Sequence, residues 1–133
     1  MDIICFPYER VVEINTLILS TEPGMKGKID IPRLQGALAR IDNAITYNGL
    51  DDVFEISAKY TASIAIAHAL PDANKRTGLA VGLEYLSLND YEITVDNDFL
   101  ADAVRDLVLG EINEFDFADI LYSCYIASIN KNE

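Results

Sequence analysis

The stretch from Val53 to Ala67 constrains the fold most, because it is apolar on nearly every side of a helix. Its apolar and small residues include Ile56, Ala58, Ala62, Ile64, Ala65 and Ile66. A helix of this kind is normally buried by other elements on most of its faces. Its small side chains also allow neighbouring helices to approach closely. The sequence therefore predicts a bundle in which residues 53–67 form the central helix.

Apolar residues recur at helical spacing on both sides of this segment. They predict helices from Pro7 to about Leu19, over 32–47, over 74–88, from Asp96 or Asp98 to about Leu109, and over 114–129. Residues 91–95 alternate between apolar and polar, which indicates a short strand, and the polar tail 130–133 is expected to fray. The stretch 22–30, with two glycines and one proline, predicts a loop or small hairpin. We expect an all-α single domain, 1–133, of about six helices.

A dense set of polar residues follows the central segment directly. His68, the only histidine in the chain, stands at its end, and Pro71 prevents the helix from continuing. We therefore expect a loop over 69–73 and a new helix from about Asn74. The free N–H groups and the dipole at the start of a helix favour an anion, most often a phosphate.

Two cations stand where positive charge does not help a helix. Lys75 and Arg76 fall in the first turn, where they oppose the helix dipole. An anion bound between them would explain their position. Asp72 offers a carboxylate for a hard cation such as Mg²⁺, and histidine can accept a proton near neutral pH. Singly, His68 and Asp72 are ordinary residues for a helix end and a helix cap, but their joint spacing favours phosphate chemistry.

The run from His68 to Thr77 resembles the signature of the Fic/Doc family, HxFx(D/E)GNxR. It is most similar to the Doc (death-on-curing) branch, HxFxDANKRT, which Asp72–Thr77 matches without a gap. Leu70 stands where the family has Phe, a difference that concerns packing more than chemistry. Leu79 stands where the wider family has a further arginine. The resemblance extends over roughly residues 22–125.

This resemblance implies a Fic-like bundle with a flap near 22–30 that docks a target segment. It also implies the toxin of a toxin–antitoxin pair, which uses ATP to phosphorylate elongation factor Tu and so arrests translation and growth. His68 would be the general base and Asp72 the Mg²⁺ ligand. The phosphates would be held by three neighbours, Asn74, Lys75 and Arg76.

Lys75 separates two possible reactions. Most AMP-transferring Fic proteins have Gly at this position, whereas in the Doc branch the lysine goes with ATP bound in the reverse orientation, so that phosphate is transferred. AMP transfer to a protein hydroxyl remains the alternative enzyme. A non-catalytic binding module with a Fic fold is the alternative of a different class.

The self-inhibitory pattern of the wider family, [S/T]xxxE(G/N), does not occur in this sequence. The resemblance therefore implies an external inhibitor, an antitoxin whose disordered C-terminal segment folds on the toxin.

The formal net charge of −12 argues against direct nucleic-acid binding, which requires a basic face. The start of the sequence, Met1–Phe6, has neither a basic region nor a long apolar stretch, so we expect no signal peptide and no membrane span. A cytoplasmic protein is the expectation that follows.

Overall fold

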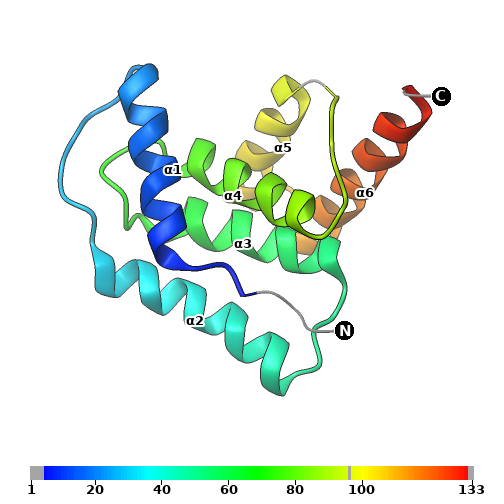
Figure 1. Ribbon diagram of the computed structural model, residues 1–133, viewed down its shortest axis with the longest axis horizontal. Coiled ribbons are helices and arrows are strands. Elements are labelled where there is room, and N and C mark those ends of the chain that lie inside the picture. The colour runs from blue at the N-terminus through cyan, green and yellow to red at the C-terminus, as the bar shows by residue number, and fades with distance from the viewer. Residues whose placement is uncertain (1–4, 96, 132–133) are drawn as a thin grey trace.

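Six helices make up the secondary structure of residues 5–95 and 97–131, the part of the chain that this computed structural model describes (Figure 1). In chain order they are α1 (Tyr8–Thr21), α2 (Ile31–Tyr47), α3 (Val53–Ala67), α4 (Asn74–Leu88), α5 (Asn97–Leu109) and α6 (Glu114–Lys131). The expected all-α bundle is confirmed. None of these helices is long and apolar enough to cross a membrane.

The central position expected for residues 53–67 is also confirmed. α3 packs against α2, α4, α5 and α6, and Figure 1 shows it running through the middle of the bundle beside α4. Ile56, Tyr60 and Ile64 are almost completely buried. An end of α3 is therefore held from several sides, which makes it a rigid platform for a functional side chain.

Glycines on α4 allow it to pack closely against α3. The hydroxyl of Thr61 donates to the carbonyl oxygen of Gly78 at 3.0 Å, and that of Ser57 donates to the carbonyl of Gly82 at 2.7 Å. A Cβ atom built on Gly78 would lie 2.7 Å from the carbonyl oxygen of Thr61. Any side chain at Gly78 would therefore push α3 and α4 apart.

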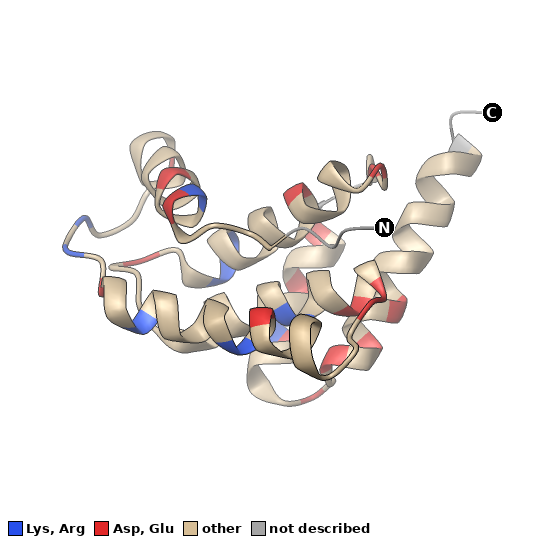
Figure 2. Cartoon of the chain, turned by 60° about the horizontal axis from the view of Figure 1, so that its bottom comes forward, with Lys and Arg blue, Asp and Glu red and all other residues tan. Residues whose placement is uncertain are grey.

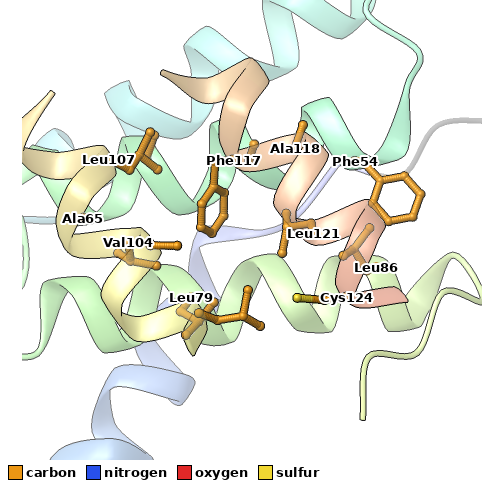
Figure 3. Close-up of a cluster of buried hydrophobic side chains, with 14 residues drawn as sticks. Phe54, Ala65, Leu79, Leu86, Val104, Leu107, Phe117, Ala118, Leu121 and Cys124 are labelled. Atoms are coloured by element: carbon orange, nitrogen blue, oxygen red, sulfur yellow. The ribbon is translucent and has the colours of Figure 1, made fainter. Parts of the chain in front are cut away.

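Two apolar clusters lie on opposite sides of the α3–α4 pair. Figure 3 shows the first, which α3 and α4 form with α5 and α6; it includes Phe54, Leu79, Leu86, Val104, Leu107, Phe117 and Leu121. The second lies toward α1 and α2 and includes Val11, Leu34, Leu38, Ile56, Tyr60 and Tyr85. Leu70 is only 6% exposed and belongs to this second cluster, so it packs in the core although the family signature has Phe there.

Side-chain caps mark two helix starts that the sequence indicated. The Asp52 carboxylate accepts hydrogen bonds from the backbone N–H groups of Phe54 and Glu55, and Asp30 accepts one from Arg33. Each cap satisfies N–H groups that have no partner within the helix.

The strand expected over residues 91–95 is wrong. This segment is irregular, and its Thr94 N–H donates to the Ser128 hydroxyl rather than to another strand. Tyr91, Ile93 and Val95 pack against the first cluster, while the residues between them face outward. The alternation thus reflects one-sided packing of an extended segment.

Smaller differences concern helix ends. α1 continues to Thr21, beyond the expected Leu19, and α6 includes Asn130 and Lys131, which were expected to fray. Of the two proposed caps for α5, Asp98 lies in its first turn and Asp96 is outside the described residues.

Candidate functional site

The loop between α3 and α4 begins and ends with a residue in the left-handed backbone region. His68 has φ 54° and ψ 35°, and Ala73 has φ 59° and ψ 33°. Each costs about 1–2 kcal/mol in a residue other than glycine. Such conformations persist when the surroundings hold them, and they concentrate at functional sites.

Side chains from outside the loop and from α4 hold it in place. The Asn74 amide donates to the carbonyl of Leu70 and accepts from its N–H group, both at 3.3 Å. The Asn15 amide nitrogen donates to the Asp72 carbonyl at 2.9 Å and to the Thr77 hydroxyl at 3.1 Å. Asn15 is 1% exposed, so α1 fixes the position of Asp72 from within the core.

The five side chains singled out in the sequence surround one cavity of about 320 Å³. It is lined by Ala65, His68, Asp72, Ala73, Asn74, Lys75, Arg76 and Val108. The imidazole therefore comes from the end of α3, the carboxylate from the loop, and the cations from the first turn of α4.

The start of α4 has features that favour a bound anion. No side chain caps it, and its first N–H groups have no partner within the helix. The residues of this first turn line the cavity. Lys75 is exposed and makes no ion pair with any residue from 5–95 or 97–131. Free N–H groups, a helix dipole and a free ammonium group together favour phosphate.

Asp72 is held in its charged form. Its carboxylate accepts a hydrogen bond from the N–H of Met25 at 2.8 Å and one from the N–H of Ala73 at 2.7 Å. These bonds, with the charge of Arg76, lower the pKa of Asp72 below its ordinary value. An ionised carboxylate beside an anion site fits Mg²⁺, which is usually held by one or two carboxylates together with substrate phosphates and water. No cluster of three potential protein ligands for a metal occurs in the described part of the chain.

The loop 22–30, between α1 and α2, closes against the cavity, and it forms no hairpin. Arg76 donates to the Glu22 carboxylate at 2.8 Å and to the Pro23 carbonyl at 3.1 Å. Together with the Met25 contact to Asp72, these bonds tie the start of the loop to two of the five candidate residues. A carboxylate thus engages one donor group of Arg76.

Two residues of this site escaped the sequence analysis. Asn15 lies at core spacing on α1, one residue after the buried Ile14, and a polar side chain at a buried position would have been a signal. The sequence gives no signal for a role of Glu22, because a glutamate beside a Pro-Gly turn is ordinary.

Comparison with known proteins agrees with this geometry. Residues 5–86 match the family model described as Fic/DOC family. The chain belongs to the Fic/Doc family. The Fic/Doc match spans α1 to most of α4 and therefore includes both helices that flank the motif loop.

One Fic/Doc relative is similar over nearly the whole chain. The sequence is 32% identical to "Protein kinase doc" of Escherichia phage P1 over 117 residues, which cover 88% of this chain and 92% of that protein. The resemblance to the Doc branch is therefore confirmed. The similarity also extends past residue 86, so it includes helices that the family model leaves out.

Proposed function

We propose that this Fic/Doc protein is the toxin of a toxin–antitoxin pair and transfers the γ-phosphate of ATP to a hydroxyl group of a protein. The observation that carries the proposal is the convergence of a base, a carboxylate and an anion-binding helix start on one cavity. The similarity to a relative named as a protein kinase supports phosphate as the transferred group. Elongation factor Tu is the target that the resemblance to the Doc branch leads us to propose, with translation in the cytoplasm as the process arrested.

His68 acts as the general base in this proposal. It takes the proton of a target Ser or Thr hydroxyl while the oxygen attacks the γ-phosphorus and ADP leaves. The imidazole is exposed, so a protein substrate can reach it. Because α3 is packed on several sides, the backbone that carries the base is held relative to the start of α4.

The start of α4 holds the phosphates. Backbone N–H groups of the first turn, the Lys75 ammonium and the Arg76 guanidinium stabilise the charge that spreads over the transferred group. The Asn74 side chain is engaged with Leu70, so we assign it to the shape of the loop and its backbone N–H to the phosphate.

Asp72 would hold Mg²⁺ in this proposal, and the ion, when bound, neutralises phosphate charge. The Asp72 carboxylate is ionised and lies on the same cavity as Lys75 and Arg76. Glu22 and Pro23 engage both terminal nitrogens of the Arg76 guanidinium, so a bound phosphate would compete with them for this side chain.

An antitoxin completes the proposed system. The sequence lacks the self-inhibitory glutamate pattern of the wider family, so an active enzyme requires an inhibitor on another chain. A disordered segment that folds on the toxin covers a large surface and is released by proteolysis.

The experiment that tests the proposal separates the two transfer reactions. Purified protein is incubated with elongation factor Tu and with ATP labelled at the α- or the γ-phosphate, and the modified protein is weighed by mass spectrometry. We expect label from the γ position only, an added mass of phosphate, and no transfer by His68→Ala. Addition of AMP would replace the proposed reaction with AMP transfer, and full activity of His68→Ala would refute the general base.

A matched pair of variants tests the Mg²⁺ ligand. Asp72→Ala should abolish metal-dependent transfer, whereas Asp51→Ala, which removes an exposed carboxylate from the turn before α3, should leave transfer unchanged. Equal activity of the two variants would reduce Asp72 to a structural residue.

A further inference from the structure

A second cavity, of about 250 Å³, lies between the later part of α1 and the loop 22–30. It shares no lining residue with the active-site cavity, although Pro71, from the loop between α3 and α4, belongs to its wall. Figure 1 shows the two loops at the same end of the molecule, on the left. The cavity therefore lies next to the candidate active site and is distinct from it.

The loop that covers this cavity is held against the body of the protein. Its start is tied to the active site by the hydrogen bonds described above, and at its end Asp30 donates its N–H to the Ala69 carbonyl at 2.7 Å. In between, the loop approaches Pro71 so closely that a Cβ atom built on Gly27 would lie 3.3 Å from the Pro71 Cβ. The shape of the cavity is therefore defined by contacts along the loop.

The wall formed by α1 offers hydrogen-bond acceptors. The Asn15 amide nitrogen donates to Asp72 and Thr77, and the Asn15 Oδ1 accepts from no residue that the structure describes. The hydroxyls of Thr16 and Ser20 donate to carbonyl oxygens of α1, so only their lone pairs stay available. Asn15, Thr16 and Ser20 all line the cavity. A ligand there meets three acceptors on this wall.

The opposite wall offers a cation and the remainder is apolar. Lys26 is exposed and makes no hydrogen bond or ion pair with any described residue. Residues 25–29 include Lys26 and Lys28 but no carboxylate. Figure 2 shows the basic segments of this loop in blue at the left edge, whereas many acidic segments lie toward the opposite end of the molecule. Leu19, Ile29 and Pro71 supply the apolar surface of the cavity.

We propose that this cavity binds a small apolar α-amino acid, about the size of leucine, as its zwitterion. The ammonium group has three N–H donors, which match the three acceptors on α1. The carboxylate pairs with Lys26, and the apolar side chain packs on Leu19 and Ile29. Sites for drug-sized ligands measure about 300–1,000 Å³, so a cavity of about 250 Å³ suits a smaller molecule.

The two charged groups of the ligand are both required by this arrangement. A carboxylic acid without an amine leaves the acceptors of α1 unpaired, and an amine without a carboxylate brings a second cation to Lys26. This inference goes beyond the proposed function and holds whether or not the chain transfers phosphate.

The test titrates the isotope-labelled full chain with L-leucine and follows the backbone amide signals by NMR. We expect saturable shifts concentrated in residues 15–20 and 22–30. Isocaproate, which lacks the amine, and isoamylamine, which lacks the carboxylate, should bind at least about tenfold more weakly, because each loses hydrogen bonds to a charged group.

Matched variants locate the ligand. Lys26→Gln should raise the Kd for leucine about tenfold or more, whereas Lys28→Gln makes the same charge change on the same loop outside the cavity and should leave the Kd unchanged. Ser20→Ala should raise the Kd by about threefold to tenfold. The neighbouring Thr21→Ala removes a hydroxyl that is bonded within α1 and does not line the cavity, so it should have no effect. The dispersion of the amide signals confirms that each variant is folded.

Four results would overturn the inference. These are no saturable shifts up to about 10 mM leucine, equal shifts with sodium chloride, binding of isocaproate or isoamylamine as tight as that of leucine, and equal Kd values for Lys26→Gln and Lys28→Gln. Leucine binding by a chain that transfers no phosphate would refute the proposed function alone. Phosphate transfer by a chain that does not bind leucine would refute this inference alone.

Discussion

The Glu22 carboxylate and the Arg76 guanidinium lie 2.8 Å apart although 54 positions separate them in the chain. Both side chains are about half exposed, so the pair contributes little to stability. Its importance lies in position, because Arg76 is a cation of the proposed phosphate site. While the pair persists, the loop 22–30 is tied to that site.

Replacing Glu22 should therefore strengthen nucleotide binding. Glu22→Gln keeps the size of the side chain and removes the charge that competes for Arg76. We expect the Kd for Mg·ATP, measured by calorimetry, to fall by up to about fivefold, since exposed ion pairs are worth up to about 1 kcal/mol. Glu13→Gln makes the same change of net charge on α1, where Glu13 contacts Arg10, and should leave the Kd unchanged. Identical affinities for both variants would show that Glu22 does not compete with phosphate.

Asn15 should matter for both stability and catalysis. Asn15→Asp preserves the shape but removes the donor to the Asp72 carbonyl and the Thr77 hydroxyl. Leaving a buried group unsatisfied costs about 1–3 kcal/mol in the free energy of unfolding, measurable by urea denaturation. Because the loop is freed, kcat should fall more than KM for ATP rises. The neighbouring Thr16→Ala removes an exposed hydroxyl bonded to its own helix and serves as the control. A stable variant with normal kcat would show that α1 does not position the loop.

The contact between α3 and α4 predicts opposite effects for one substitution at two helical glycines. Gly78→Ala places a methyl group 2.7 Å from the Thr61 carbonyl oxygen and should destabilise the fold by about 1–3 kcal/mol. Gly36→Ala on α2 meets no atom within 4 Å and should stabilise by about 0.5–1 kcal/mol, because alanine is the better helix former. Chemical denaturation of both variants and of the wild type would measure these changes in the free energy of unfolding. Equal effects would mean that the two helices are not in close contact.

Acid sensitivity should depend on Glu84. Its carboxylate receives two hydrogen bonds from Arg10, at 2.8 Å and 2.6 Å, and these lower the pKa of Glu84. A lowered folded-state pKa gives stability that is present above the unfolded pKa, about 4.3, and disappears as the pH falls through the folded value. The difference in unfolding free energy between wild type and Glu84→Gln should therefore be largest at neutral pH and shrink below about pH 4. A difference that does not change with pH would exclude this linkage.

Sequence reasoning located the motif side chains because they are contiguous. His68, Asp72 and the cations lie within ten positions, so one loop and one helix start bring them together. The helices were predictable for a similar reason, since periodicity and caps such as Asp52 are local signals. The roles assigned to the motif residues stay predictions.

Contacts over long sequence separations were not predictable. Asn15 reaches Asp72 across 57 positions, and Glu22 reaches Arg76 across 54. The wrong expectation of a strand at 91–95 has the same cause, because strand pairing is also a contact between distant parts of the sequence. Alternation reports which side of a segment is buried, and only the packing against the first cluster shows that no strand pairs with it.

The glycines of α4 have a consequence for the rate of the proposed reaction. The residue proposed as proton acceptor follows α3, and the amides proposed to bind the anion begin α4, so the distance between them depends on the separation of these two helices. Hydrogen bonds from Ser57 to the Gly82 carbonyl and from Thr61 to the Gly78 carbonyl hold the two helices at this separation. A methyl group added at Gly78 would lengthen the path of the proposed proton transfer, because Gly78 lies one turn from the start of α4. The packing of α3 against α4 and the rate of the proposed reaction would therefore depend on the same two glycines, Gly78 and Gly82.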